Sequence, residues 1–154
     1  MKPLRIGLLG IGTVGGGTFD VLARNAEEIS RRAGRPITIT HVADKNTTLA
    51  NQVVAGRAVV TDDAFALVKN PDIDVIIELI GGYTIAKQLM LEAINNGKHV
   101  VTANKALLAL HGNEIFGAAR AKGVIVAFEA AVAGGIPIIK ALREGLVANR
   151  IEWI

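Results

Sequence analysis

The segment Gly10-Ile11-Gly12-Thr13-Val14-Gly15 is the strongest indication in this chain of how it folds. It has the spacing G-x-G-x-x-G, and it directly follows a short apolar run from Leu4 to Leu9. An amphipathic segment from Val14 to about Arg32 comes next, and Gly34 ends it. A glycine loop between a buried strand and a helix is the context in which this motif is typical of dinucleotide-binding α/β domains.

Each position of the glycine loop has a distinct physical role in that interpretation. Gly10 permits a tight turn, and Gly12 lacks a Cβ, so the backbone can approach a pyrophosphate closely. Gly15 lets the helix pack close to the strand. The first turn of the helix, with Thr13 and Val14, then offers free N–H groups and a partial positive charge to the phosphates. The alternative is an ordinary glycine-rich turn, which the flanking strand and helix disfavour.

The composition limits the function classes. The chain has 154 residues, the size of one domain, and 51% of them are hydrophobic while 20% are charged, which is typical of folded globular proteins. The net charge is +3, and the basic residues are scattered among acids, so a nucleic-acid partner is not expected. Without Cys, disulfides, cysteine-bound zinc and a thiol nucleophile are excluded. No apolar run is long enough to span a membrane and no signal peptide is readable, which predicts a cytoplasmic protein.

Short apolar runs alternate with helical patterns along the whole chain. This alternation predicts a Rossmann-type, doubly wound parallel sheet of about six strands with helices on both faces. The expected strands are Leu4 to Leu9, Ile37 to Ala43, Ala58 to Val60, Ile73 to Ile80, His99 to Thr102 and Val124 to Phe128. The expected helices are Val14 to Arg32, one capped by Asp62 and reaching Val68, Thr84 to Asn96, Asn113 to Lys122 and Pro137 to Leu146, with Asn46 to Gly56 a loop or weak helix.

Residues 1–150 are therefore expected to form one nucleotide-binding domain. The last residues, Ile151 to Ile154, have the pattern of a strand that begins a further, truncated domain.

Asp44 and Lys45 follow the second expected strand, where a Rossmann domain contacts the adenosine ribose. Asp44 favours NAD because a carboxylate binds the ribose hydroxyls. Lys45 favours NADP because it could pair with a 2′-phosphate. The choice between the two cofactors stays open, and a polar turn at the end of the strand is the alternative for both residues.

The fourth and fifth strands end in two further distinctive blocks. Glu78-Leu79-Ile80-Gly81-Gly82 would let the backbone pass close to the nicotinamide side of a dinucleotide, or would form a simple turn. Thr102-Ala103-Asn104-Lys105 places Lys105 toward the same side. That lysine could stabilise and protonate the alkoxide formed when a hydride reaches a carbonyl. The alternative for Lys105 is a solvated lysine at the start of a helix.

The sixth strand leads into Glu129 and a loop of small residues that runs to Pro137. Exposed carbonyls in such a loop could ligate a hard cation through oxygen, which is a weak signal by itself. The histidines, His41, His99 and His111, lack the spacing of metal ligands and receive no role.

Together these blocks resemble homoserine dehydrogenases of the bacterial type. The resemblance covers the whole chain and is carried by Gly10 to Gly17, Glu78 to Gly82, Val101 to Lys105 and Glu129 to Pro137. It implies an NADH- or NADPH-dependent oxidoreductase that reduces L-aspartate 4-semialdehyde to L-homoserine, on the route to threonine and methionine.

The resemblance also implies roles for matching residues. Gly10 to Gly15 would hold the pyrophosphate, Asp44 and Lys45 would face the adenosine ribose, and Gly81 and Thr102 would line the nicotinamide side. Lys105 matches one of two lysines near the reacting carbonyl. A sodium site is implied at Glu129, Val132, Gly134 and Ile136.

The family chain continues well past Ile154, and this continuation carries the second lysine, the acids that hold the substrate amino group and the sheet that joins two subunits. It also returns a C-terminal segment to the nucleotide domain. We therefore expect this chain to be inactive alone and the full-length protein to be a homo-oligomer. The alternatives are another Rossmann reductase, or a regulatory nucleotide-sensing domain, which would have no need of Lys105 or the Glu129 loop.

Overall fold

Six parallel strands form the centre of the computed structural model, which describes residues 2–152. They are β1 (Leu4–Leu9), β2 (Ile37–Ala43), β3 (Val59–Thr61), β4 (Val75–Glu78), β5 (His99–Thr102) and β6 (Val126–Ala127). Their order in the sheet is β3-β2-β1-β4-β5-β6. The chain reverses its winding direction between β1 and β4, and the carboxyl ends of these strands therefore flank the crevice where doubly wound sheets bind ligands. The predicted fold class is confirmed.

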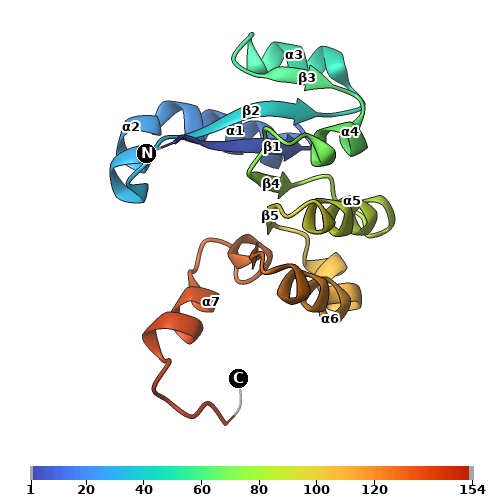
Figure 1. The fold of residues 1–154 in the computed structure, drawn as a ribbon. Coiled ribbons are helices and arrows are strands. Elements are labelled where there is room, and N and C mark those ends of the chain that lie inside the picture. The colour runs from blue at the N-terminus through green and yellow to red at the C-terminus, as the bar shows by residue number, and fades with distance from the viewer. Residues whose placement is uncertain (1, 153–154) are drawn as a thin grey trace.

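Helices pack on both faces of this sheet (Figure 1). On one face, α1 (Thr13–Arg24) and α3 (Thr47–Val54) share a core with Leu8, and α2 (Ala26–Ala33) follows α1. On the other, α4 (Ala64–Lys69), α5 (Thr84–Asn95) and α6 (Lys105–Lys122) share a core with Leu9. Neighbouring residues of β1 thus enter opposite cores, as the two-residue period of a strand requires. Within the described residues, no helix has the length and apolarity to cross a membrane.

Two of the helices differ most from the sequence prediction. The segment predicted as one helix is divided at Asn25, whose backbone leaves the helical region (φ −104°, ψ 19°) and separates α1 from α2. The last helix before β6 begins eight residues earlier than predicted, at Lys105 instead of Asn113. The cause is Asn104, whose side chain accepts a hydrogen bond from the Leu107 N–H and caps the first turn. Gly112 is tolerated inside this long helix.

Smaller differences also have local causes. Asn46 caps α3 through the Leu49 N–H, so the weak segment is a helix, and Asp63 rather than Asp62 caps α4. The sixth strand is shorter than predicted because the Val124 N–H donates to the Ala119 carbonyl at the end of α6. Val124 therefore belongs to the end of the helix and not to the strand.

After β6 come the 3₁₀ turn η1 (Glu129–Ala131), α7 (Ile138–Lys140) and the π-helical turn η2 (Ala141–Gly145). Figure 1 shows α7 projecting away from the sheet. The predicted strand at Ile151 is wrong for residues 151–152, which have no regular structure, and its residues 153–154 lie outside the described residues.

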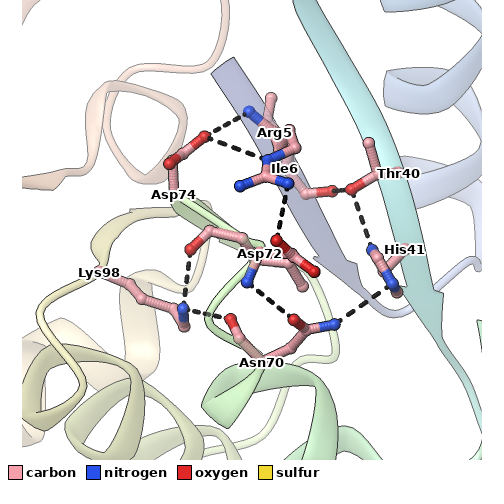
Figure 2. A network of polar contacts seen from close by, with 9 residues as sticks. Arg5, Ile6, Thr40, His41, Asn70, Asp72, Asp74 and Lys98 are labelled. Carbon is pink, nitrogen blue, oxygen red and sulfur yellow. Dashed lines mark hydrogen bonds and ion pairs between the residues drawn. The ribbon is translucent and has the colours of Figure 1, made fainter. Parts of the chain in front are cut away.

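A network of polar contacts joins the amino ends of β1, β4 and β5 (Figure 2). This end of the sheet is opposite the glycine loop. Lys98 is only 3% exposed, and its ammonium donates to the carbonyl oxygens of Asn70 at 2.6 Å and Ile73 at 2.7 Å. The Asp74 carboxylate accepts from the backbone N–H of Arg5 at 2.8 Å. Burial lowers the pKa of Lys98 from 10.5, Asp74 raises it and Arg5 lowers it. Because the folded pKa lies below the unfolded one, this group adds stability as the pH rises from its folded pKa toward 10.5.

Replacing Lys98 by Met is expected to lower the free energy of unfolding by about 2 kcal/mol at neutral pH. The change removes the ammonium that donates to two backbone carbonyls in the connection between α4 and β4. These carbonyl oxygens then lose this hydrogen-bond donor in a buried place. Urea unfolding measures the effect. The matched control is Lys2→Met at an exposed position, where we expect a change within about 0.5 kcal/mol. Equal stability of the Lys98 variant and the unmodified chain would show that the network contributes nothing.

Candidate functional site

The turn after β1 requires glycine at two of its positions. Gly10 has φ +91°, and a Cβ there would lie 2.9 Å from the carbonyl oxygen of Leu79. A Cβ on Gly15 would collide with the carbonyl oxygen of Gly10. These glycines are therefore needed for the chain to turn and for α1 to pack against β1, as the sequence predicts.

Gly12 has a different reason to be glycine. It is the residue before α1, with an ordinary φ of −59°, and a Cβ there would meet no atom within 4 Å. No side chain caps this end of α1, and its first turn carries no acid. Thr13 and Val14 are exposed in that turn. Packing therefore does not explain Gly12, and the space beside it leaves the N-terminus of α1 open to the approach of a ligand.

Asp44 lies beside the glycine loop and holds it in place. One carboxylate oxygen accepts from the Ile11 N–H at 2.7 Å, and the other accepts from the Asn46 N–H at 2.8 Å. Sequence reasoning predicts contact between Asp44 and a ribose but misses this support of the loop. Each oxygen retains a lone pair that can accept from a ribose hydroxyl. The neighbouring Lys45 is exposed.

A cavity of about 340 Å³ opens between the ends of β1, β2 and β4. It is lined by Gly10, Gly12, Ala43, Asp44, Lys45, Asp62, Ala64, Leu79, Ile80, Ile85 and Leu89. Ile80 and Ile85 are 40% and 44% exposed, so this cavity has an apolar wall beside the charged pair Asp44 and Lys45. Such a combination suits a flat base joined to a sugar. The sequence places Ile80 in the distinctive block after the fourth strand but gives neither isoleucine a role, because a single apolar residue in a loop or first helical turn has no distinctive pattern.

A second cavity of about 290 Å³ lies at the ends of β4 and β5. It is lined by Val14, Glu78, Leu79, Gly81, Ala103, Asn104, Lys105 and Ala106. Lys105, the first residue of α6, is exposed here together with Gly81. Leu79 lines both cavities, so they form neighbouring parts of one surface that runs past the glycine loop.

Thr102 occupies a different place from the one expected. It is fully buried at the end of β5, and its hydroxyl donates to the buried Glu78 carboxylate at 2.7 Å. Thr102 therefore lies under the second cavity, and its hydroxyl contacts Glu78.

Glu129 connects the end of β6 with α7. Its two carboxylate oxygens accept from the backbone N–H groups of Ile139 and Lys140, both at 2.9 Å. Glu129 thus provides hydrogen-bond acceptors for two backbone N–H groups of α7. The half-buried Glu129 begins the turn that includes Val132, Gly134 and Ile136. No cluster of three or more His, Cys, Asp or Glu side chains suited to a metal exists in the described residues. The carboxylate of Glu129 and the backbone carbonyls of this segment are oxygen atoms, the ligand type that hard cations take.

Comparisons with known proteins agree with this geometry. Residues 10–129 match the family described as homoserine dehydrogenase, NAD binding domain. The chain is 64% identical over 154 residues to a homoserine dehydrogenase of Pseudomonas aeruginosa, and it spans 35% of the length of that relative.

Solved structures of the same family have the same fold. A homoserine dehydrogenase from Thiobacillus denitrificans is 63% identical, with a TM-score of 0.93 over 99% of this chain and 35% of its own. A hyperthermophilic archaeal homoserine dehydrogenase in complex with NADPH has a TM-score of 0.77 at 21% identity, over 96% of this chain and 50% of its own. The chain belongs to the family of homoserine dehydrogenase NAD-binding domains.

Proposed function

We propose that this chain is the cofactor-holding part of a homoserine dehydrogenase, which reduces L-aspartate 4-semialdehyde to L-homoserine with NADH or NADPH. The observation that carries this proposal is the surface shared by the two cavities. One end presents Asp44 and Lys45, and the other presents Lys105. Gly12 and the open N-terminus of α1 lie beside this surface, at the position where a pyrophosphate would join the two ends.

Different residues would bind different parts of the cofactor. Backbone N–H groups of Thr13, Val14 and Gly15 would bind the pyrophosphate. Asp44 would accept from ribose hydroxyls of NAD, or Lys45 would pair with the 2′-phosphate of NADP. Gly81 would lie against the nicotinamide side, with Thr102 supporting that side from below.

When bound, the cofactor supplies a hydride to the carbonyl carbon of the substrate. The carbonyl oxygen would gain negative charge as the carbon is reduced, and Lys105 would stabilise that charge. An ammonium group at the exposed start of α6 stabilises this charge and donates the proton that makes the hydroxyl of the product.

The family resemblance assigns the rest of the substrate site to residues beyond this chain. The second lysine, the acids that hold the substrate amino group and the subunit-joining sheet belong to that part of the family, and residues 1–150 are proposed as the nucleotide-binding domain. A hollow of about 880 Å³ along the sheet, lined by Ile6, Ile77 and Val101 among others, supports the proposal that a returning segment packs there.

The sodium site is proposed at Glu129, Val132, Gly134 and Ile136. Because Glu129 already ties the end of β6 to α7, an ion there would brace the turn that leads out of the nucleotide-binding domain. The cytoplasmic location and the homo-oligomeric state of the full-length protein stay predictions.

A regulatory nucleotide-sensing domain is the second candidate function. It would use the glycine loop and Asp44 in the same way. Lys105 favours the reductase, because a cation beside the second cavity can stabilise the charge on a reacting carbonyl oxygen, which nucleotide sensing does not require.

Activity of the complete enzyme tests the proposal. The protein that contains this chain together with the remaining portion of its relatives is expected to oxidise L-homoserine with NAD or NADP, followed as absorbance of the reduced cofactor. The 154-residue chain alone is expected to bind cofactor without turnover. Turnover by the isolated chain would contradict the proposed division of the site, and an inactive, folded complete protein would contradict the proposed reaction.

A further inference from the structure

A charged side chain is buried beneath the second cavity. Glu78, at the end of β4, is 0% exposed. One carboxylate oxygen accepts from the backbone N–H groups of Ile80 at 2.9 Å and Gly81 at 3.3 Å, and the other accepts from the Thr102 hydroxyl at 2.7 Å. Three donors are directed at the two carboxyl oxygens, so the polar atoms of this buried side chain are satisfied within the fold. Burying a carboxyl group is costly, so this arrangement needs a reason.

The hydrogen bonds continue from Glu78 into a closed ring. The Thr102 hydroxyl accepts from the Asn104 N–H at 3.0 Å. The Asn104 amide donates to the Gly82 carbonyl at 2.5 Å, and its oxygen accepts from the Leu107 N–H at 3.1 Å. The ring therefore joins the loop after β4 to the first turn of α6. That turn begins with Lys105, so a single buried carboxylate is connected to both walls of the second cavity.

The loop held by Glu78 needs such support. Gly81 and Gly82 both have positive φ, at 78° and 68°, and a Cβ on either would meet no atom within 4 Å. Side-chain packing therefore does not fix this part of the loop, and glycine is its most flexible residue. The hydrogen bonds from Glu78 and Asn104 are what hold the backbone in place.

We propose that Glu78 is the positioning residue for the nicotinamide end of the cofactor site. It fixes the backbone of Gly81 directly, and it fixes the first turn of α6 through Thr102 and Asn104. This inference rests on the proposed function. The adenosine end has its own carboxylate, Asp44, which holds the glycine loop through Ile11. Separate carboxyl groups thus support the two ends of the site. A substitution at one end is therefore expected to weaken ligand contacts at that end and leave the other end unchanged.

Glu78→Gln tests this separation, because the amide puts a donor where the ring requires an acceptor. Two probes are compared. The first is whichever of NADH and NADPH binds the unmodified chain more tightly. The second is the matching ADP-ribose, with or without the 2′-phosphate, which lacks the nicotinamide. Calorimetry is expected to show reduced-cofactor binding weakened by about tenfold or more, and ADP-ribose binding unchanged within about twofold. Asp44→Ala is the matched control, in which both affinities are expected to fall.

Thr102 provides a second test that leaves Glu78 itself unchanged. Thr102→Val keeps the shape but removes the hydroxyl, and it is expected to weaken binding of the reduced cofactor by about tenfold with ADP-ribose little affected. Thr102→Ser keeps the hydroxyl and is expected to restore affinity to within about twofold of the unmodified chain. This pair decides the question if Glu78→Gln does not fold.

The outcomes separate the inference from the function on which it rests. Unchanged reduced-cofactor affinity in the Gln and Val variants, or an equal loss of reduced cofactor and ADP-ribose in folded variants, overturns the role of Glu78 and leaves the proposed function intact. Failure of the unmodified chain to bind either probe overturns the proposed function and this inference with it.

Discussion

Replacing Lys105 by Met in the complete enzyme is expected to lower kcat by about 10²–10⁴-fold, the usual contribution of a positioned proton donor. Lys105 is the exposed first residue of α6 and lines the second cavity with Gly81. Its ammonium stabilises the charge that develops on the carbonyl oxygen, and methionine has no group that can do so. The side chains are of similar length, so the cavity keeps its shape.

The same substitution is expected to change cofactor affinity by less than about threefold, because the pyrophosphate and ribose contacts lie elsewhere on the site. Steady-state kinetics and calorimetry with the reduced cofactor separate the two effects. Lys122→Met, at the exposed far end of the same helix, is the control and should leave kcat unchanged. Undiminished turnover in the Lys105 variant would refute its catalytic role and favour the nucleotide-sensing alternative.

Gly15→Ala is expected to have the largest effect on stability, lowering the free energy of unfolding by about 3 kcal/mol or more. The added methyl collides with the backbone carbonyl of Gly10, and no flexible side chain can move aside to relieve the contact. α1 must therefore shift away from β1. Urea unfolding followed by circular dichroism measures the loss.

Gly12→Ala is the matched comparison within the same loop. A methyl there meets no atom within 4 Å, and φ is compatible with alanine, so stability is expected to change by less than about 1 kcal/mol. Dinucleotide affinity is nevertheless expected to fall at least about tenfold, because the methyl occupies the approach to the helix N-terminus. If Gly15→Ala were as stable as Gly12→Ala, the assignment of Gly15 to packing would be wrong.

The glycine loop and the sheet could be predicted because the residues that build them are adjacent in sequence. Apolar runs separated by glycine turns determine the order of strands and helices, and Gly10 and Gly15 occupy positions that only glycine fits. The start of α6 was harder to predict. Asn104 caps the helix, but the glycine at 112 interrupts the helical pattern beyond it and favours a later start.

The polar contacts of the site join residues that are far apart in the chain, so the sequence alone does not reveal them. Asp44 holds Ile11 across 33 positions, and Thr102 donates to Glu78 across 24. The family resemblance implies that Thr102 lines the nicotinamide side, but strand register places its buried side chain beneath the second cavity, opposite Glu78. A buried glutamate at the end of an apolar strand was the only signal of this arrangement.

Calorimetric titration of the 154-residue chain with NADH and NADPH tests whether the glycine loop and the two cavities beside it form a dinucleotide site. We expect saturable binding of one dinucleotide per chain, and at least tenfold weaker binding by Gly12→Ala. The absence of binding by the folded chain, or equal affinity in the Gly12 variant, would contradict the account.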